Sequence, residues 1–236
     1  MSKPLGHRAY GSIGHLPGSR TGPGDHTIEA NQADIILNGK PGFVVTASEK
    51  VDGSCVSVAR VGDKILALGR AGYLCSTAPF EHLRAFTGWV AEREGCFMDA
   101  LKPGERFVGE LINKRIGVPY LVAHPNGLFQ AFDLMRGHER ATLDEWSERA
   151  RGLPMGVVHR HVVNHDLHRC PREWHQWHRG VTRFGATRVC LDESEGIVYR
   201  VESKKKQTVS FLAKWVRNTH VPGEFLEQDI YNQGAR

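Results

Sequence analysis

The residues best suited to covalent chemistry lie in a short run, Glu-Lys-Val-Asp-Gly-Ser, at positions 49–54. Lysine is a good nucleophile only when its amine is neutral, so the neighbours of Lys50 must lower its pKa. The run lies between two segments that favour strands, and a lysine at a tight turn beside a glycine is well placed to approach a nucleotide phosphate. By itself, a K-x-D-G pattern is more typical of a solvated turn, so further residues must decide.

Four later segments place charged side chains in otherwise apolar strands. They are F-V-G-E-L-I with Glu110, F-Q-A-F-D-L with Phe132 and Asp133, E-G-I-V-Y-R with Glu195, and F-L-A-K-W-V-R with Lys214. An acid in an apolar strand is unfavourable unless it meets a partner, a metal or a ligand. Each acid alone is as compatible with a structural salt bridge as with a binding site. The ordered set, and not any one segment, therefore indicates function.

The elements that must position these side chains are mostly strands. Alternating polarity and β-branched residues predict strands at 43–47, 55–61, 64–68, 106–112, 128–134, 157–163, 196–201 and 208–216. Gly62 and Asp63 predict a hairpin turn between two of them. Many strands and few helices predict an α+β fold with largely antiparallel sheets.

Helical signals are fewer. Apolar residues at helical spacing predict a helix over 80–93, and a Thr-Leu-Asp-Glu capping box at 142–145 predicts a second helix to about Arg151. Pro171 is expected to begin a short third helix. Residues 1–27 are expected to form a loop segment because glycine and proline recur there.

The ordered segments resemble the covalent nucleotidyltransferase superfamily of ATP-dependent ligases and mRNA-capping enzymes, and within it the ATP-dependent RNA ligases. The motifs of that family read K-x-D-G, G-E, F-D, E-G-x-V and a lysine-bearing strand, and all five occur here in order between residues 49 and 217. A His-Leu-Pro sequence within 10–20 resembles a segment that precedes the first motif in RNA ligases. The resemblance implies a single nucleotidyltransferase (ATP-grasp-like ligase adenylation) domain over 1–236, with antiparallel sheets flanked by helices.

The resemblance also implies a role for each matching residue. Lys50 would attack the α-phosphate of ATP and form a lysyl-AMP phosphoramidate. Glu110 would hold the ribose hydroxyls, and Phe132, with Phe129 as the alternative, would stack on adenine. Glu195 would help to hold a divalent metal, Mg²⁺ or Mn²⁺, through water.

Four further residues have roles implied in the same way. Lys214 would contact the α-phosphate, Arg70 would touch the nucleotide or the RNA 5′-phosphate, and Glu49 would reach the edge of the base. Asp52 of the first motif belongs to the expected catalytic set. Phosphoryl transfer needs positioning and neutralisation of phosphate charge. Lys214 and the metal would supply the positive charge that neutralises the phosphate. The same cations would favour the neutral form of Lys50 by electrostatic repulsion.

The sequence departs from the family where RNA ligases often carry K-x-K. Leu212 or Val216 stands at the matching distance from Lys214, and Arg217 or a lysine within 204–206 is a candidate replacement. About twenty residues follow this strand, which is too few for an OB-fold or another appended ligase domain. Self-adenylylation is therefore a safer expectation than complete sealing of a strand break.

Composition limits the class of partner. A formal charge of +5 and a pI of about 9.0 fit a polyanion. RNA with a 5′-phosphate and a 3′-hydroxyl is the expected partner, and a protein partner remains open. No apolar run is long enough for a bilayer and no secretory signal is recognisable, so a cytoplasmic protein without a membrane partner is expected.

Three rival functions stay open at this point. An mRNA-capping guanylyltransferase or a DNA ligase would use the same chemistry, although the missing room for an OB-fold argues against both. A degenerate relative could bind nucleic acid without catalysis, although it would have little need for the acids Asp52, Glu110 and Glu195.

One segment is rich in possible zinc ligands. H-x-H and H-x-x-H spacings can chelate zinc, but these spacings match no known signature and a polar surface segment is the favoured interpretation. The residues concerned are His159, His161, His165, His168, Cys170, His175 and His178. Five cysteines without a C-x-x-C pair also argue against a disulfide framework and a Cys-only zinc site.

Overall fold

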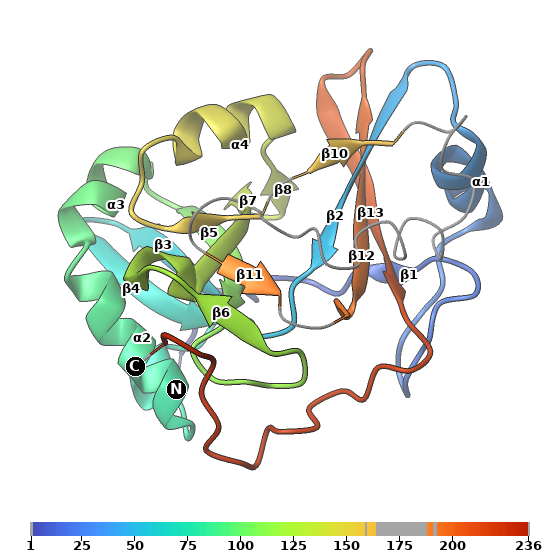
Figure 1. Ribbon diagram of the computed structural model, residues 1–236. Helices are drawn as coiled ribbons and strands as arrows, with labels where there is room; N and C mark the ends of the chain where they lie inside the picture. Colours follow the sequence, from blue (N-terminus) through green and yellow to red (C-terminus); the bar gives the residue numbers. More distant parts are fainter. Residues whose placement is uncertain (1, 159, 164–187, 191–192, 236) are drawn as a thin grey trace.

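Two large sheets face one another and helices cover their outer faces (Figure 1). The computed structural model describes residues 2–158, 160–163, 188–190 and 193–235. Sheet A has the order β1-β13-β12-β2-β10 and sheet B the order β4-β3-β5-β7-β8, with β9 paired to β7. Among the described strands only β1–β13 and β7–β9 pair in parallel, so the largely antiparallel α+β fold is confirmed.

The bounds of the elements follow the sheets. Sheet A contains β1 (Gly14–His15), β2 (Phe43–Lys50), β10 (His161–Val162), β12 (Gly196–Ser203) and β13 (Thr208–Val216). Sheet B contains β3 (Ser54–Val61), β4 (Lys64–Gly69), β5 (Glu105–Leu111), β7 (Phe129–Arg136), β8 (Glu139–Arg140) and β9 (Gly156–Val157). A two-stranded sheet pairs β6 (Tyr120–Val122) with β11 (Arg188–Cys190). The helices are α1 (Ala30–Asn38), α2 (Glu81–Ala91), α3 (Glu94–Ala100) and α4 (Leu143–Ala150), with short 3₁₀ turns at Cys75–Thr77 and Pro125–Leu128.

Period-two alternation gives sheet A two different faces. Ala47, Tyr199 and Ala213 lie in one cross-strand row and pack in the core against α1. The next row, Ser48, Val198 and Lys214, points to the other face. That face looks toward sheet B, which is why alternate residues of the predicted strands can line one site.

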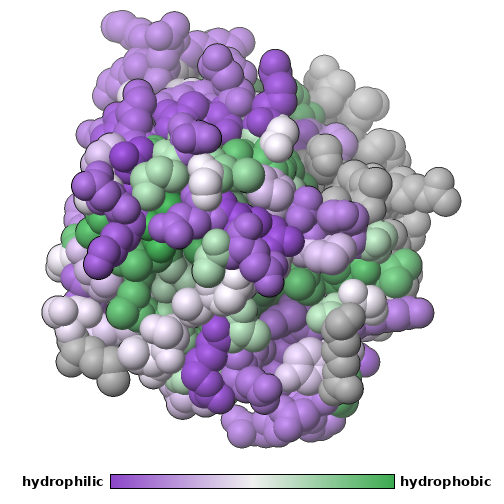
Figure 2. All heavy atoms as spheres, turned by 90° about the vertical axis from the view of Figure 1, so that its left-hand side faces the viewer, coloured by the Kyte–Doolittle hydropathy of each residue, from purple (hydrophilic) through white to green (hydrophobic). Residues whose placement is uncertain are grey.

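Sheet B packs its outer face on α2, α3 and α4. Val56, Phe107 and Phe129 lie in this core with Phe86 and Trp89 of α2. Figure 2 shows hydrophilic side chains over most of the outer surface on this side of the molecule, with smaller hydrophobic areas between them. The inner face of sheet B is left to face sheet A.

No helix in the described part of the chain is long and apolar enough to cross a membrane.

The structure corrects several predicted elements. The expected strand at 157–163 is divided into β9, which joins sheet B, and β10, which joins sheet A. The expected helix at 80–93 ends at Ala91, and α3 follows as a separate helix. The 1–27 segment contains β1, and the sequence analysis missed α1, α3 and β6. Thr142 caps α4 as predicted, because its hydroxyl accepts from the Glu145 amide. The helix expected from Pro171 lies outside the described residues.

Candidate active site

A cleft between the inner faces of sheets A and B gathers most of the predicted site residues. It has a cavity volume of about 120 Å³ and opens to solvent. Six predicted residues line it: Glu49, Lys50, Arg70, Glu110, Phe132 and Lys214. The other two predicted residues, Asp52 and Glu195, lie beside it, and Glu195 contacts Lys50 directly.

Lys50 ends β2 directly opposite Gly196 of β12, so the residue before Gly196 lies next to it. The Lys50 Nζ donates to Glu195 Oε2 at 2.5 Å. Burial lowers the pKa of Lys50, but the charges of Glu195, Glu110 and Asp52 outweigh burial and raise it overall. The protein groups alone therefore favour the charged amine, because three acids surround this lysine.

The turn after Lys50 is held from both sides. The Tyr120 hydroxyl accepts from the Asp52 amide at 3.0 Å and donates to Glu49 Oε1 at 3.3 Å. Gly53 is required here, because a Cβ at this position would lie 2.6 Å from the carbonyl oxygen of Leu111. Glu49 thus lines the cleft, and its carboxylate accepts a hydrogen bond from Tyr120. Tyr120 was missed by the sequence analysis, because its strand has only three residues.

Glu110 lies on β5 between Cys55 of β3 and Gln130 of β7. Burial raises its pKa to about 8, an effect that Lys50 only partly offsets. Its Oε2 atom is buried and has no hydrogen-bond partner among the described residues. A buried carboxylate oxygen without a partner is costly, and a ligand with hydroxyl groups would satisfy it.

Replacing Glu110 with glutamine will raise stability at high pH. Below its ordinary pKa of 4.5 the carboxyl is protonated in both states, but between 4.5 and about 8 only the unfolded chain loses the proton. Wild-type stability therefore falls as pH rises through this window, whereas glutamine does not ionise. Urea unfolding at about pH 5 and about pH 9 should show a gain only at the higher pH. The same variant should bind ATP at least about tenfold more weakly. A gain in stability that is equal at both pH values would refute a raised pKa of Glu110 in the folded protein.

A β-bulge explains why the aromatic residue is Phe132. Val108 pairs with Asp133 and Gly109 with Ala131, so Phe132 is the extra residue on β7. Because a bulge re-aims side chains, Phe132 and Asp133 both meet Tyr10, in an edge-on ring contact at 5.3 Å and in a hydrogen bond at 2.8 Å. Phe129, the alternative stacking residue, is fully buried in the helix-covered core. It does not line the cleft.

Lys214 lies in the row of Ser48 and Val198, and its Nζ is 3.5 Å from Asp25 Oδ1. Burial is the largest contribution to its pKa, which is lowered. Leu212 lines the cleft beside it, where the second lysine of a K-x-K pair was sought. The Arg217 guanidinium donates to the Ser194 carbonyl at 3.0 Å.

The lysines at 204–206 do not supply the missing cation. They occupy the turn after Ser203, at the opposite end of β12 from Glu195. Eight strand residues separate the two ends, which corresponds to roughly 25 Å. They are exposed, as a solvated loop would be.

Comparison with known proteins identifies the family. A family model of RNA ligases matches residues 43–216, which include every strand that lines the cleft. The chain belongs to the RNA ligase family. No curated protein matches its sequence.

Solved structures support the fold of this RNA ligase family chain. A putative ATP-dependent DNA ligase from Aquifex aeolicus is 17% identical with a TM-score of 0.52, over 88% of this chain and 49% of that one. A mutant of Naegleria gruberi RNA ligase with ATP and Mn is 16% identical with a TM-score of 0.51, over 89% of this chain and 61% of that one. The chain thus spans about half to three fifths of the length of these two proteins.

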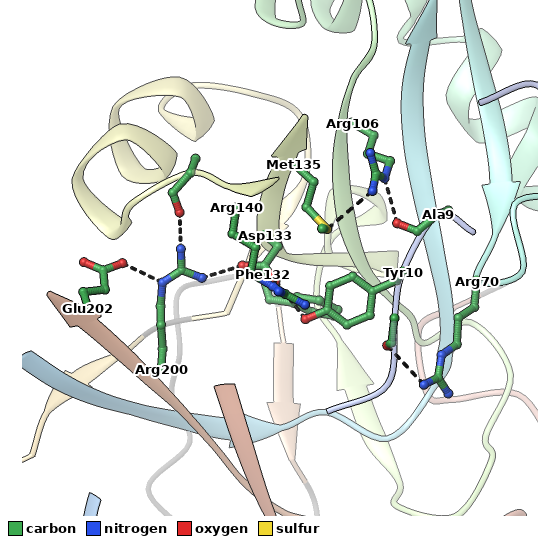
Figure 3. Close-up of polar contacts among 12 residues, drawn as sticks. Ala9, Tyr10, Arg70, Arg106, Phe132, Asp133, Met135, Arg140, Arg200 and Glu202 are labelled. Carbon is green, nitrogen blue, oxygen red and sulfur yellow. Dashed lines mark hydrogen bonds and ion pairs between the residues drawn. The ribbon is translucent and has the colours of Figure 1, made fainter. Parts of the chain in front are cut away.

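The two sheets of this family member are joined by a buried ionic network around Asp133 (Figure 3). The fully buried Asp133 carboxylate accepts from Tyr10 at 2.8 Å, from Arg200 at 2.6 Å and from Arg140 at 3.2 Å. Arg200 reaches across from β12 of sheet A and also pairs with Glu202 at 2.7 Å. The network therefore links the two walls of the cleft.

A group of side chains that could bind a metal ion lies next to the Lys50 amine. Asp52, Glu195 and His220 each offer one ligand atom, and these three atoms lie within 4.8 Å of one another. All three residues are buried. Two carboxylates and an imidazole are donors that divalent cations accept, so these residues fit a divalent metal. His220 was missed by the sequence analysis because it follows the last predicted strand.

The histidine-rich segment is described only in part. His161 is exposed on β10. His159, His165, His168, Cys170, His175 and His178 lie outside the described residues, so the zinc hypothesis stays untested.

Proposed function

We propose that this chain is an ATP-dependent RNA ligase that acts through a lysyl-AMP intermediate. The observation that carries the proposal is the convergence of Lys50, Glu110, Phe132 and Lys214, from four strands of two sheets, on one cleft. RNA with a 5′-phosphate and a 3′-hydroxyl is the proposed substrate, and RNA end joining or repair the proposed role.

Each wall of the cleft has a proposed task. Phe132 stacks on adenine, and the unpartnered Glu110 carboxylate accepts from the ribose hydroxyls. Lys214 neutralises charge on the α-phosphate, and Arg70 lies at the rim, where its guanidinium donates to the Gly11 carbonyl at 3.2 Å. A divalent cation, Mg²⁺ or Mn²⁺, held by Asp52 and Glu195 would stabilise negative charge on the phosphate oxygens.

The proposed reaction has three displacements at phosphorus. The Lys50 ammonium first loses a proton to water, and the neutral amine then forms a bond to the α-phosphorus of ATP as pyrophosphate leaves. An oxygen of the RNA 5′-phosphate then takes the AMP group, and the amine of Lys50 is released. Finally the 3′-hydroxyl attacks the 5′-phosphorus, AMP leaves and the phosphodiester forms. Glu195 keeps the Lys50 amine oriented before the first step, since the two groups are 2.5 Å apart.

Label transfer tests the proposal. The chain is incubated with α-labelled ATP and Mg²⁺ or Mn²⁺ and then run on a denaturing gel. Label on the protein that moves to 5′-phosphorylated RNA, but not to the same RNA with a 5′-hydroxyl, is the expected result. Label from GTP would indicate a capping enzyme, and sealing of nicked DNA alone would indicate a DNA ligase. Salt-dependent RNA binding without any label would leave a binding protein and refute the proposal.

A further inference from the structure

Three segments that are distant in sequence bring the metal-binding group together. Asp52 lies in the turn after β2, Glu195 immediately precedes β12, and His220 follows β13. Their exposed fractions are 7%, 8% and 3%. Two atoms bound to one ion at about 2.1 Å lie at most about 4.2 Å apart. The observed separations, all within 4.8 Å, therefore need only a small adjustment to hold an ion directly.

The imidazole of His220 faces Glu195, one of the two acids of the group. Its Nε2 is 3.7 Å from Glu195 Oε1, which is too long for a hydrogen bond. The backbone sets its position, because the His220 amide donates to the Arg217 carbonyl at 3.2 Å. The imidazole therefore faces an acid of the group at a separation that two ligands of one ion can have.

The other two ligands are oriented from outside the group. Asp52 Oδ2 accepts from the Val118 amide at 2.8 Å, and Glu195 Oε2 is held by Lys50 at 2.5 Å. Gly117 backs the group from the opposite side. A Cβ there would lie 2.5 Å from Asp52 Oδ2 and 3.2 Å from His220 Cε1, so only glycine leaves both side chains in place.

We propose that His220 is a direct nitrogen ligand of the divalent cation and makes this site prefer Mn²⁺ or Co²⁺ to Mg²⁺. Imidazole suits first-row transition metals, whereas Mg²⁺ takes oxygen ligands and keeps most of its water. The cation is thus held by one nitrogen and two carboxylate oxygens, next to the amine of Lys50. The role of that cation in catalysis rests on the proposed function, but its binding does not.

Metal titration without ATP or RNA tests the inference. Mn²⁺ and Mg²⁺ are titrated calorimetrically into the wild-type chain, His220→Gln and the control His138→Gln, which removes an exposed histidine on the other sheet. The Kd for Mn²⁺ should rise at least about tenfold in His220→Gln and stay unchanged in His138→Gln. The Kd for Mg²⁺ should change little in either. An unchanged Mn²⁺ affinity, or an equal loss for both metals, would overturn the proposal.

A measurement on the wild-type chain covers the case in which His220→Gln does not fold. Pulsed electron paramagnetic resonance of the Mn²⁺-loaded protein should show coupling of the metal to a ¹⁴N nucleus. Bound Mn²⁺ without such coupling would overturn the inference. These measurements need no catalysis. Nitrogen coupling in a protein that takes no label from ATP would therefore refute only the proposed function. Label transfer by a protein whose bound Mn²⁺ shows no coupling to ¹⁴N would refute only the proposal that His220 is a metal ligand.

Discussion

Lys50→Ala will reduce transfer of label from α-labelled ATP to the protein by at least about a thousandfold, because it removes the side chain that is proposed to bond to the α-phosphorus. Lys50→Arg should be equally inactive. A guanidinium keeps the positive charge beside Glu195 but does not become neutral at any working pH, so it cannot attack. The pair of variants separates the need for a nucleophile from the need for a cation.

Lys64→Ala is the matched control, because Lys64 is exposed on β4 and lies outside the cleft. It should keep full label transfer. Circular dichroism must show that each Lys50 variant is folded, since Lys50→Ala leaves Glu195 without its 2.5 Å partner. Folded Lys50→Ala that still accepts label would mean that another side chain is the nucleophile.

Asp133→Ala will lower the free energy of unfolding by about 3–5 kcal/mol, because it removes the buried anion that Arg200 and Arg140 share and leaves Arg200 with Glu202 alone. Arg200 is only 2% exposed and has Asp133 as its partner on sheet B. Arg140 also points at the same carboxylate. Removing one buried partner costs far more than removing a surface ion pair.

Urea unfolding of Asp133→Ala against Asp63→Ala measures this effect. Asp63 is exposed in the β3–β4 hairpin turn, so its replacement should change stability by less than about 0.5 kcal/mol. Asp133→Ala should also weaken ATP binding, since Tyr10 loses its hydrogen bond and packs on Phe132. A loss below about 1 kcal/mol would show that the network does not hold the sheets together.

The order of motifs made the candidate site predictable in part. Alternating polarity predicted the strands that carry Glu110, Phe132 and Lys214, because a strand half-buried against a core must repeat every two residues. The cleft contains these three side chains together with Lys50. Their roles in binding and catalysis stay predictions.

The alternation of side chains along a strand did not predict the structure where a bulge or a change of pairing partner interrupts it. The bulge opposite Val108 and Gly109 places Phe132 and Asp133 on the cleft side in succession, which strict alternation forbids. The strand expected at 157–163 is shared between two sheets, because its two ends pair with β7 and β2. Pairing partners of this kind are remote in sequence and leave no local signal.

By itself, the sequence determined that this chain carries the ordered residues of the RNA ligase family on antiparallel strands, because motif order and period two are local properties. Only the tertiary structure decided which groups surround Lys50. It brought Glu195 to 2.5 Å across a strand pair, joined the sheets through Asp133 and placed His220 beside Asp52. The physical reason is that burial and charge act through space, so the pKa of a lysine and the donor set of a metal depend on residues that folding alone makes neighbours.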